Sequence, residues 1–128
     1  MRIYDDYDEL GTLISYSDIQ SIEAWLRQGK NIDVSDEDGT TGLFHALSMG
    51  LFDIVRFLVS HGADINRQRD DGYTPLIQSV ISGGLCTKWL VENGADVALK
   101  DVEGRTALDH ALLWGRQSCI AYLQSLAE

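Results

Sequence analysis

The sequence contains few of the features that mark secreted or membrane-bound proteins. Its 128 residues include only two cysteines, Cys86 and Cys119, 33 residues apart. If they lie on successive stacked helices about 9–10 Å apart, they are too distant for a disulfide, and we expect both to be small core residues. No stretch approaches the roughly 20 apolar residues that cross a bilayer. The opening sequence MRIYDDYDEL is acidic almost from its start, unlike a secretory signal peptide. We therefore expect a cytoplasmic protein without a membrane attachment.

Positive charge is also scarce. Ten lysines and arginines stand against 20 aspartates and glutamates, which gives a formal net charge of −10. Binding to nucleic acid or to anionic lipid draws on clustered cations, so neither is an expected partner. A basic protein is the partner that this charge would attract.

Proline occurs once, as Pro75 in the stretch DDGYTPL, and this stretch returns in altered form as EDGTTGL and VEGRTAL. The three glycines of these stretches, Gly39, Gly72 and Gly104, are 33 and 32 residues apart. Two further series keep nearly the same spacing: Gly29, Gly62, Gly94 and Gly50, Gly83, Gly115. A period close to 33 residues is typical of stacked structural repeats.

The recurring residues predict where helices begin and end. Threonine can cap a helix that follows it, and this place is held by Thr41, Thr74 and Thr106, with Asp8 in a looser first unit. Proline is tolerated in the next position because the first helical residue has no intrahelical bond to lose. Glycines with a left-handed backbone would then end a first and a second helix in each unit. Ser17 stands in the place of Gly50, and a one-residue shortening after Gly83 predicts a loop deletion.

The pattern resembles that of ankyrin repeats, most clearly in DGYTPL and WLVENGADV, and it matches from Asp36 to Glu128. The resemblance implies an all-α fold, an ankyrin-repeat solenoid of helix-turn-helix units with short β-turn or hairpin loops. We expect a single domain over residues 1–128 that is a monomer when free. It would comprise a degenerate N-terminal capping repeat (1–35), repeats 36–68 and 69–100, and a C-terminal capping repeat (101–128).

An enzyme or a metal site would depend on three histidines, His45, His61 and His110. His45 and His110 occupy the same place two repeats apart. Because neighbouring packed helices are already about 9 Å apart, these two side chains cannot share a metal whose ligand bonds are about 2.1 Å long. His61 precedes a helix-ending glycine, where it can donate to helix carbonyls. Asp109 adjoins His110, but neighbours on a helix do not face each other. We therefore expect no catalysis, no metal and no cofactor.

The resemblance places function at positions that vary between repeats, because a concave face formed by loop tips and first-helix ends binds the partner in this family. At the helix ends this face would carry Tyr16, Ser48, Met49, Ile81, Ser82, Leu113 and Trp114. At the loop tips it would carry Tyr7, Glu37, Asp38, Thr40, Asp70, Asp71, Tyr73, Glu103 and Arg105. An apolar strip with a charged border is typical of protein interfaces, although acidic residues are also ordinary turn formers.

The functional hypothesis is a non-catalytic protein–protein interaction module whose partner is a basic protein. Small acidic ankyrin proteins include immunity proteins that neutralise a cognate bacterial toxin, which is the more specific hypothesis. An adaptor or regulatory subunit of a larger assembly is the alternative. An enzyme or metal-binding protein that uses the three histidines is the remote one.

Overall fold

The computed structural model describes residues 5–126, with the backbone alone at Asp5. Eight helices in four consecutive pairs occur in this range, and the one strand-like feature in it is a single bridge between Ser35 and Thr41. None of the helices between residues 5 and 126 is long and apolar enough to cross a membrane. The predicted all-α fold of paired helices is confirmed. The chain divides into two compact units, residues 1–64 and 65–128.

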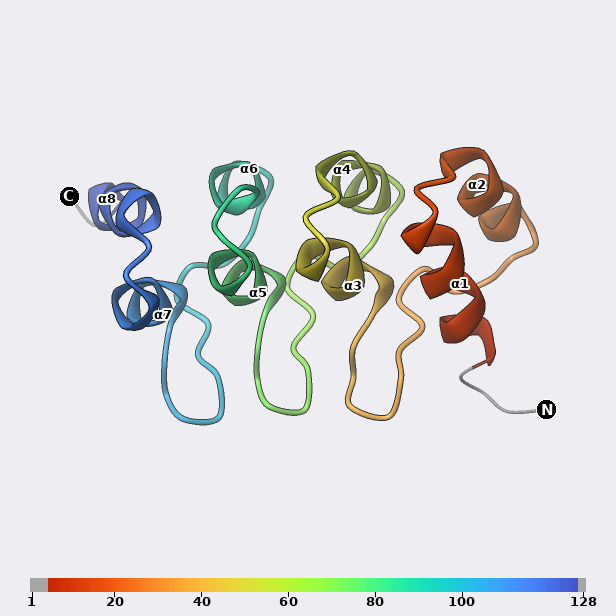
Figure 1. The fold of residues 1–128 in the computed structure, drawn as a ribbon. Coiled ribbons are helices and arrows are strands. Elements are labelled where there is room, and N and C mark those ends of the chain that lie inside the picture. The colour runs from red at the N-terminus through yellow and green to blue at the C-terminus, as the bar shows by residue number, and fades with distance from the viewer. Residues whose placement is uncertain (1–4, 127–128) are drawn as a thin grey trace. The chain divides into compact units, whose positions relative to one another are not determined.

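The first unit consists of two helix pairs, and its helices are α1 (Asp5–Ser15), α2 (Ile19–Arg27), α3 (Gly42–Ser48) and α4 (Phe52–Ser60). Helix α1 packs against α2 and α3, and α3 packs against α4 (Figure 1). The buried apolar side chains of this unit include Leu10, Ile14, Ile22, Trp25, Leu43, Phe44, Leu47, Ile54, Val55 and Leu58. Because a Cβ on Gly42 would lie 2.8 Å from Ile14 Cδ1, the first turn of α3 lies directly against α1.

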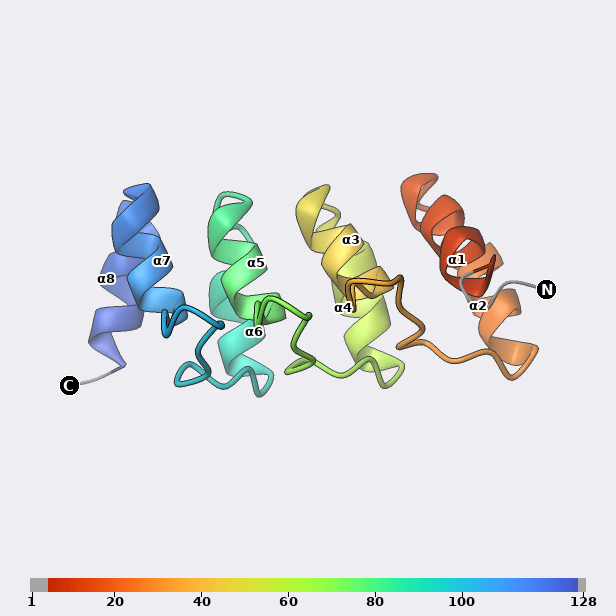
Figure 2. The same cartoon turned by 90° about the horizontal axis from the view of Figure 1, so that it is seen from below.

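The second unit repeats this arrangement with α5 (Pro75–Ile81), α6 (Thr87–Glu92), α7 (Ala107–Trp114) and α8 (Gln117–Ser125). Helix α5 packs against α6 and α7, and α8 packs against α7 and α6 (Figure 2). The buried apolar side chains here include Leu76, Ile77, Val80, Cys86, Leu90, Ala107, Ala111, Cys119 and Leu123. Both cysteines are thus buried in the core, as predicted.

The predicted threonine caps form in the second unit. Thr74 Oγ1 accepts a hydrogen bond from the backbone N–H of Ile77 at 3.1 Å, with Pro75 as the first helical residue. Thr106 and Asp109 cap reciprocally, since each side chain accepts from the backbone N–H of the other residue. Helices α5 and α7 therefore begin where the sequence predicts.

In the first unit the predicted caps are wrong. Thr41 precedes α3 but makes no side-chain capping bond, and its backbone forms the bridge to Ser35 instead. Asp8 lies inside α1, because that helix already begins at Asp5. A residue inside a helix cannot cap its start, so α1 extends further toward the N-terminus than the repeat pattern implies.

The predicted helix-ending glycines all have a positive φ: Gly29, Gly50, Gly62, Gly83, Gly94 and Gly115. Ser17, in the place of Gly50, has a φ of 54° and is the one residue other than glycine among residues 5–126 with a positive φ. The one-residue deletion after Gly83 falls in the turn before α6, and this helix has six residues, against nine in α4. Gly84 is also left-handed, and a Cβ there would collide with Cys119 Sγ, so this turn runs close to α8.

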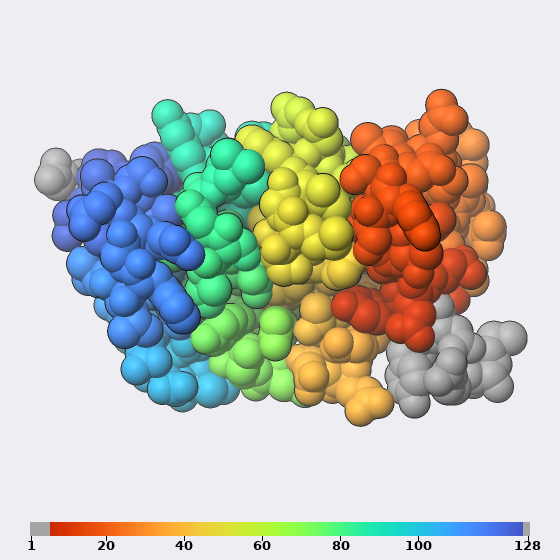
Figure 3. Space-filling model, in the orientation of Figure 1, coloured from red at the N-terminus to blue at the C-terminus, as the bar shows by residue number. Residues whose placement is uncertain are grey.

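The loops that precede α5 and α7 are packed against each other within the second unit. The backbone N–H of Val102 donates to the carbonyl oxygen of Asp71 at 3.0 Å. The Gln68 side-chain amide donates to the carbonyl oxygens of Gly72 and Lys100, both at 3.0 Å. Figure 3 shows the two loops in contact at the lower edge of this unit. Hydrogen bonds therefore fix the loops of the second unit as well as its helices.

Gly72→Ala and Gly104→Ala form a matched pair of variants that tests this loop packing. Both glycines are left-handed, with φ of +81° and +79°, but a Cβ on Gly72 would lie 2.7 Å from Asp101 Cα, whereas nothing lies within 4 Å at Gly104. We expect Gly104→Ala to lower the free energy of unfolding by about 1 kcal/mol through backbone strain alone. Gly72→Ala should cost about 3 kcal/mol, because the methyl group meets backbone atoms. Urea unfolding followed by circular dichroism measures both, and equal losses would contradict the close packing.

Candidate protein-binding surface

In the first unit, apolar side chains are exposed where the first helix of each pair ends. Tyr16 directly follows α1 and is 79% exposed, and Met49 directly follows α3 and is 45% exposed. Ser48, beside Met49, is exposed too. The two helix ends are linked through Ser15, whose hydroxyl lies 3.0 Å from His45 Nε2 and 3.8 Å from Met49 Sδ. Tyr16 and Met49, the exposed residues at these two linked helix ends, are called here the first patch.

The second unit has a corresponding second patch, formed by Ile81, Leu113 and Trp114. Leu113 and Trp114 end α7 and are 60% and 53% exposed, while Ile81 ends α5 and is half-buried. Ser82 follows Ile81 and is exposed. Leu112 is exposed as well, although the sequence analysis did not select it.

Leu112 is exposed at a repeat position where the equivalent residue of α5 is buried. It occupies the same place as Val80 on α5, which is fully buried, whereas Leu112 is 53% exposed. Helix α7 packs against α5, but no later helix in the described part of the chain packs against α7 in the same way. The repeat alignment could have identified Leu112 as an apolar residue on the side of α7 that no later helix in the described range covers.

The loop before α3 carries the acidic border of the first unit. Asp36 Oδ1 accepts hydrogen bonds from the backbone N–H groups of Asp38 and Thr40, at 2.9 and 3.0 Å, which fixes the loop. The side chains of Glu37 and Asp38 are left exposed. Together with Asp8, the three acidic loop residues line a hollow of about 240 Å³. This loop thus concentrates negative charge on a defined backbone.

Tyr7 does not lie at a loop tip. It sits in the first turn of α1 and is half-buried, because α1 begins at Asp5 and leaves no loop in that place. Nearby, Asp6 Oδ1 accepts a hydrogen bond from Lys30 Nζ at 2.8 Å, and this bond raises the pKa of Lys30. The first repeat therefore presents a helix start where the others present a loop.

The loop tips of the second unit are less acidic in effect, because arginines accompany their carboxylates. Arg69 lies 3.4 Å from Asp71 Oδ2, and Arg105 lies 3.2 Å from Glu103 Oε2. Asp70 is exposed. Surface ion pairs of this kind contribute little to stability, but they reduce the net charge that a partner meets.

A buried acid–histidine pair supports the loop before α7. His110 Nε2 lies 2.7 Å from Asp101 Oδ2, and both side chains are 2% exposed. The other oxygen of Asp101 accepts from the backbone N–H groups of Glu103 and Arg105, at 2.9 and 3.0 Å. Burial raises the pKa of Asp101, but the hydrogen bonds from Arg105, His110 and Glu103 outweigh it, so the pKa lies below its ordinary value. The ring of Tyr73 packs edge-on against His110, with centroids 5.2 Å apart.

Sequence reasoning missed this pair. It tested His110 against its neighbour Asp109, which instead caps α7. The signal that could have revealed Asp101 is its place in the repeat, since Asp36 organises the preceding α3 loop in the same way.

The remaining histidines each contact a neighbouring group. His61 Nδ1 lies 2.9 Å from the carbonyl oxygen of Phe57, as predicted for the end of a helix, and its ring stacks on Phe57. His45 is held by Ser15. Among residues 5–126, no group of three or more His, Cys, Asp or Glu side chains is placed to hold a metal ion.

All the predicted binding residues are exposed or half-buried. The structure brings Met49 close to α1 in the first unit, and it pairs Arg105 with Glu103 in the second. That these residues form one concave face stays a prediction.

Known proteins share this repeat pattern. The family described as ankyrin repeats, in three copies, matches residues 12–101 and again residues 70–128. An ankyrin repeat protein of Acanthamoeba polyphaga mimivirus is 27% identical over 97% of the chain and 16% of its own length. Human BCL-6 corepressor-like protein 1 is 35% identical over 64% of the chain, which spans 5% of that protein. Human Arf-GAP with coiled-coil, ANK repeat and PH domain-containing protein 2 is 43% identical over 48% of the chain, which spans 9% of it. The chain thus spans less than a fifth of the length of these relatives.

Asp101→Asn tests the buried pair. We expect the free energy of unfolding to fall by about 2 kcal/mol near neutral pH, because a charge-assisted buried hydrogen bond is weakened. The folded-state pKa of Asp101 lies below the unfolded value near 3.8, so its contribution is present above that value and is lost as the pH falls through the folded-state pKa. The difference between wild type and variant should therefore shrink in urea unfolding below pH ~4.

Glu103→Gln is the control for this prediction, because Glu103 is exposed in the same loop. Its stability should stay within about 0.5 kcal/mol of the wild type. A loss in Asp101→Asn that keeps its full size in acid would contradict an ionised Asp101.

Proposed function

Because the chain belongs to the ankyrin repeat family, we propose that it is a non-catalytic module that binds another protein through its exposed patches. The observation that carries this proposal is the exposure of Tyr16, Leu113 and Trp114 at the ends of two first helices, α1 and α7. Earlier in these helices, apolar residues such as Leu10, Ile14 and Ala111 are buried. Aromatic side chains at such positions do not serve the core. They are the residue types that anchor protein interfaces.

The rigidity of the scaffold supports binding without rearrangement. The loops before α3 and α7 are each fixed by one aspartate that accepts two backbone hydrogen bonds. The exposed patches lie at the ends of helices whose last turns have defined caps, such as the left-handed Gly115 after α7. A partner that docks on such a surface loses little free energy to ordering the binding site.

The charge of the chain favours a basic partner. Of the loops described, the one before α3 concentrates carboxylates, and the whole chain has a formal charge of −10. Carboxylates around an apolar patch accelerate the encounter with a cationic protein and discourage anionic competitors, while the apolar residues supply most of the affinity. Binding should therefore weaken with salt mainly through slower association.

Two biological settings suit such a module. The sequence-based hypothesis of an immunity protein that covers a basic toxin rests on size and charge alone. The adaptor or regulatory alternative gains support from the relative named for coiled-coil, ANK repeat and PH domains, of which the chain matches 9%. A toxin gene beside the gene of this chain would favour the first setting. Two buried, unpaired cysteines suit the reducing cytoplasm in either.

Capture from a lysate of the native host, followed by mass spectrometry, identifies the partner, and titration of that partner then tests the patches. We expect the Tyr16→Ala/Trp114→Ala variant to bind roughly 100-fold more weakly, since two interface anchors of this kind together contribute about 3 kcal/mol. The matched control, Leu85→Ala/Leu126→Ala, removes apolar side chains that are 69% and 43% exposed and belong to neither patch. It should bind as the wild type does. Equal affinities of the two double variants would place the interface elsewhere.

A further inference from the structure

The residue after each first-helix glycine differs between repeats, and in the last repeat it is an arginine. Arg116 follows Gly115 and reaches from the α7–α8 turn to the end of α5. Its Nε donates to the carbonyl oxygen of Val80 at 3.2 Å, and its Nη2 donates to that of Ile81 at 2.8 Å. The last carbonyls of a helix have no hydrogen-bond partner within the helix and carry partial negative charge. A guanidinium donates hydrogen bonds to these oxygens and offsets that charge.

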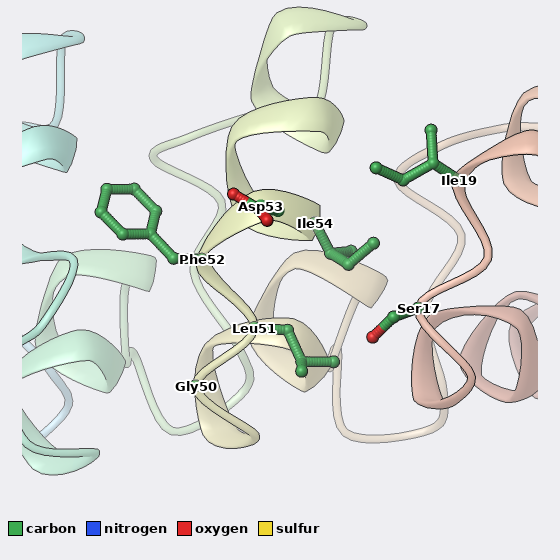
Figure 4. Close-up of a pocket in the computed structure, with 7 residues that line it drawn as sticks. All are labelled: Ser17, Ile19, Gly50, Leu51, Phe52, Asp53 and Ile54. Atoms are coloured by element: carbon green, nitrogen blue, oxygen red, sulfur yellow. The ribbon is translucent and has the colours of Figure 1, made fainter.

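In the first unit, the same position holds Leu51, which cannot donate to carbonyls. The helix that corresponds to α5 there is α1, and its last turn has no basic residue. A pocket of about 330 Å³ opens beside Leu51, between the α1–α2 turn and the start of α4 (Figure 4). Its lining consists of Ser17, Ile19, Gly50, Leu51, Phe52, Asp53 and Ile54.

The lining combines apolar walls with a carboxylate at the mouth. Ile19, Leu51 and Ile54 point toward the pocket, whereas Phe52 points away from it (Figure 4). Asp53 is the charged member of the lining, and its side chain is 80% exposed. Arg56 pairs with Asp53 Oδ1 at 2.6 Å, and no described residue donates to Oδ2.

A second carboxylate stands beside the pocket. Asp18 lies between the lining residues Ser17 and Ile19, and hydrogen bonds from Ser21 lower its pKa. An apolar slot with carboxylates at its rim suits a side chain with an aliphatic stem and a cationic head. Arginine and lysine are the two side chains of this kind.

We infer that this pocket receives an arginine side chain of the bound protein, which takes the place that Arg116 fills within the second unit. The inference rests on the proposed function and specifies the chemistry of the partner. The pocket begins one residue beyond Tyr16 and Met49, so a protein that covers the first patch also reaches it. Arginine is favoured over lysine because its planar group donates several hydrogen bonds in fixed directions, as Arg116 does.

The direct test uses three blocked tripeptides, acetyl-Gly-X-Gly-amide, in which X is arginine, lysine or norleucine. Each is titrated into the ¹⁵N-labelled full chain while amide signals are followed by NMR. The arginine peptide should shift the signals of Ser17, Ile19, Leu51 and Asp53 saturably, with a dissociation constant on the order of 1 mM. The lysine peptide should bind at least about threefold more weakly, and norleucine should give no saturable shift. No shifts, or equal shifts from lysine or norleucine, would overturn the inference.

Variants separate the pocket from general attraction of cations. Leu51→Arg supplies the guanidinium from within the chain and should abolish the shifts. Val102→Arg, at a position 72% exposed in the other unit, makes the same charge change and should leave them intact. Asp53→Asn alters a single exposed group, so it should fold even where Leu51→Arg does not, and it should weaken binding about threefold or more. Unchanged binding in Asp53→Asn would contradict the assigned role of the carboxylate.

The same variants distinguish the two proposals when the natural partner is titrated. A partner that is lost with Tyr16→Ala/Trp114→Ala, yet binds Leu51→Arg and Asp53→Asn like the wild type, would end the arginine inference and leave the proposed function standing. A partner indifferent to all of these variants would overturn both.

Discussion

Burial between neighbouring helix pairs of one unit is the constraint from which the other features follow. A single pair of short helices cannot cover its own apolar side, so α1 must pack against α3, and α5 against α7. This requirement fixes large apolar residues at the same places in each repeat, such as Val80 on α5. It also limits what those places can do for function. Residues that bind a partner must lie where neither neighbouring pair needs them, at the helix ends and in the loops.

The loops before α3 and α7 have a conformation that is fixed by specific hydrogen bonds. Asp36 and Asp101 each accept two backbone hydrogen bonds, so the loops before α3 and α7 share one geometry. Asp101 does more, because its second oxygen meets His110 in the core and joins the loop to α7. The exposed carboxylates of these loops, such as those of Asp38 and Glu103, therefore lie on a backbone that hydrogen bonds already fix. The arginines beside Asp71 and Glu103 then set how acidic the second unit is.

The helix pairs and the ends of the helices could be predicted well from the sequence. A positive φ is a local requirement that glycine meets, so it is visible in the sequence itself. The sequence predicted the start of the first repeat poorly. Helix α1 is longer than its counterparts, and Asp8 has the right residue type in the wrong place. The pairing of His110 with Asp101 and the pocket beside Leu51 were both missed, since each depends on residues that meet only after folding. The residue types of the binding surface were readable, but their contacts were not.

The place after the first-helix glycine shows why variation between repeats carries the chemistry. The backbone path there is fixed by a left-handed residue, so the side chain alone decides the outcome. Asp18 caps α2 by accepting from Ser21, Gly84 continues a left-handed turn, and Arg116 ties α7–α8 to the end of α5. Leu51 makes none of these contacts and leaves a pocket beside it. At this one position, the four repeats thus have a helix cap, a turn residue, an arginine that links two helix pairs, and a leucine beside a pocket. Of these four, the pocket is the one that leaves room for a group from another molecule.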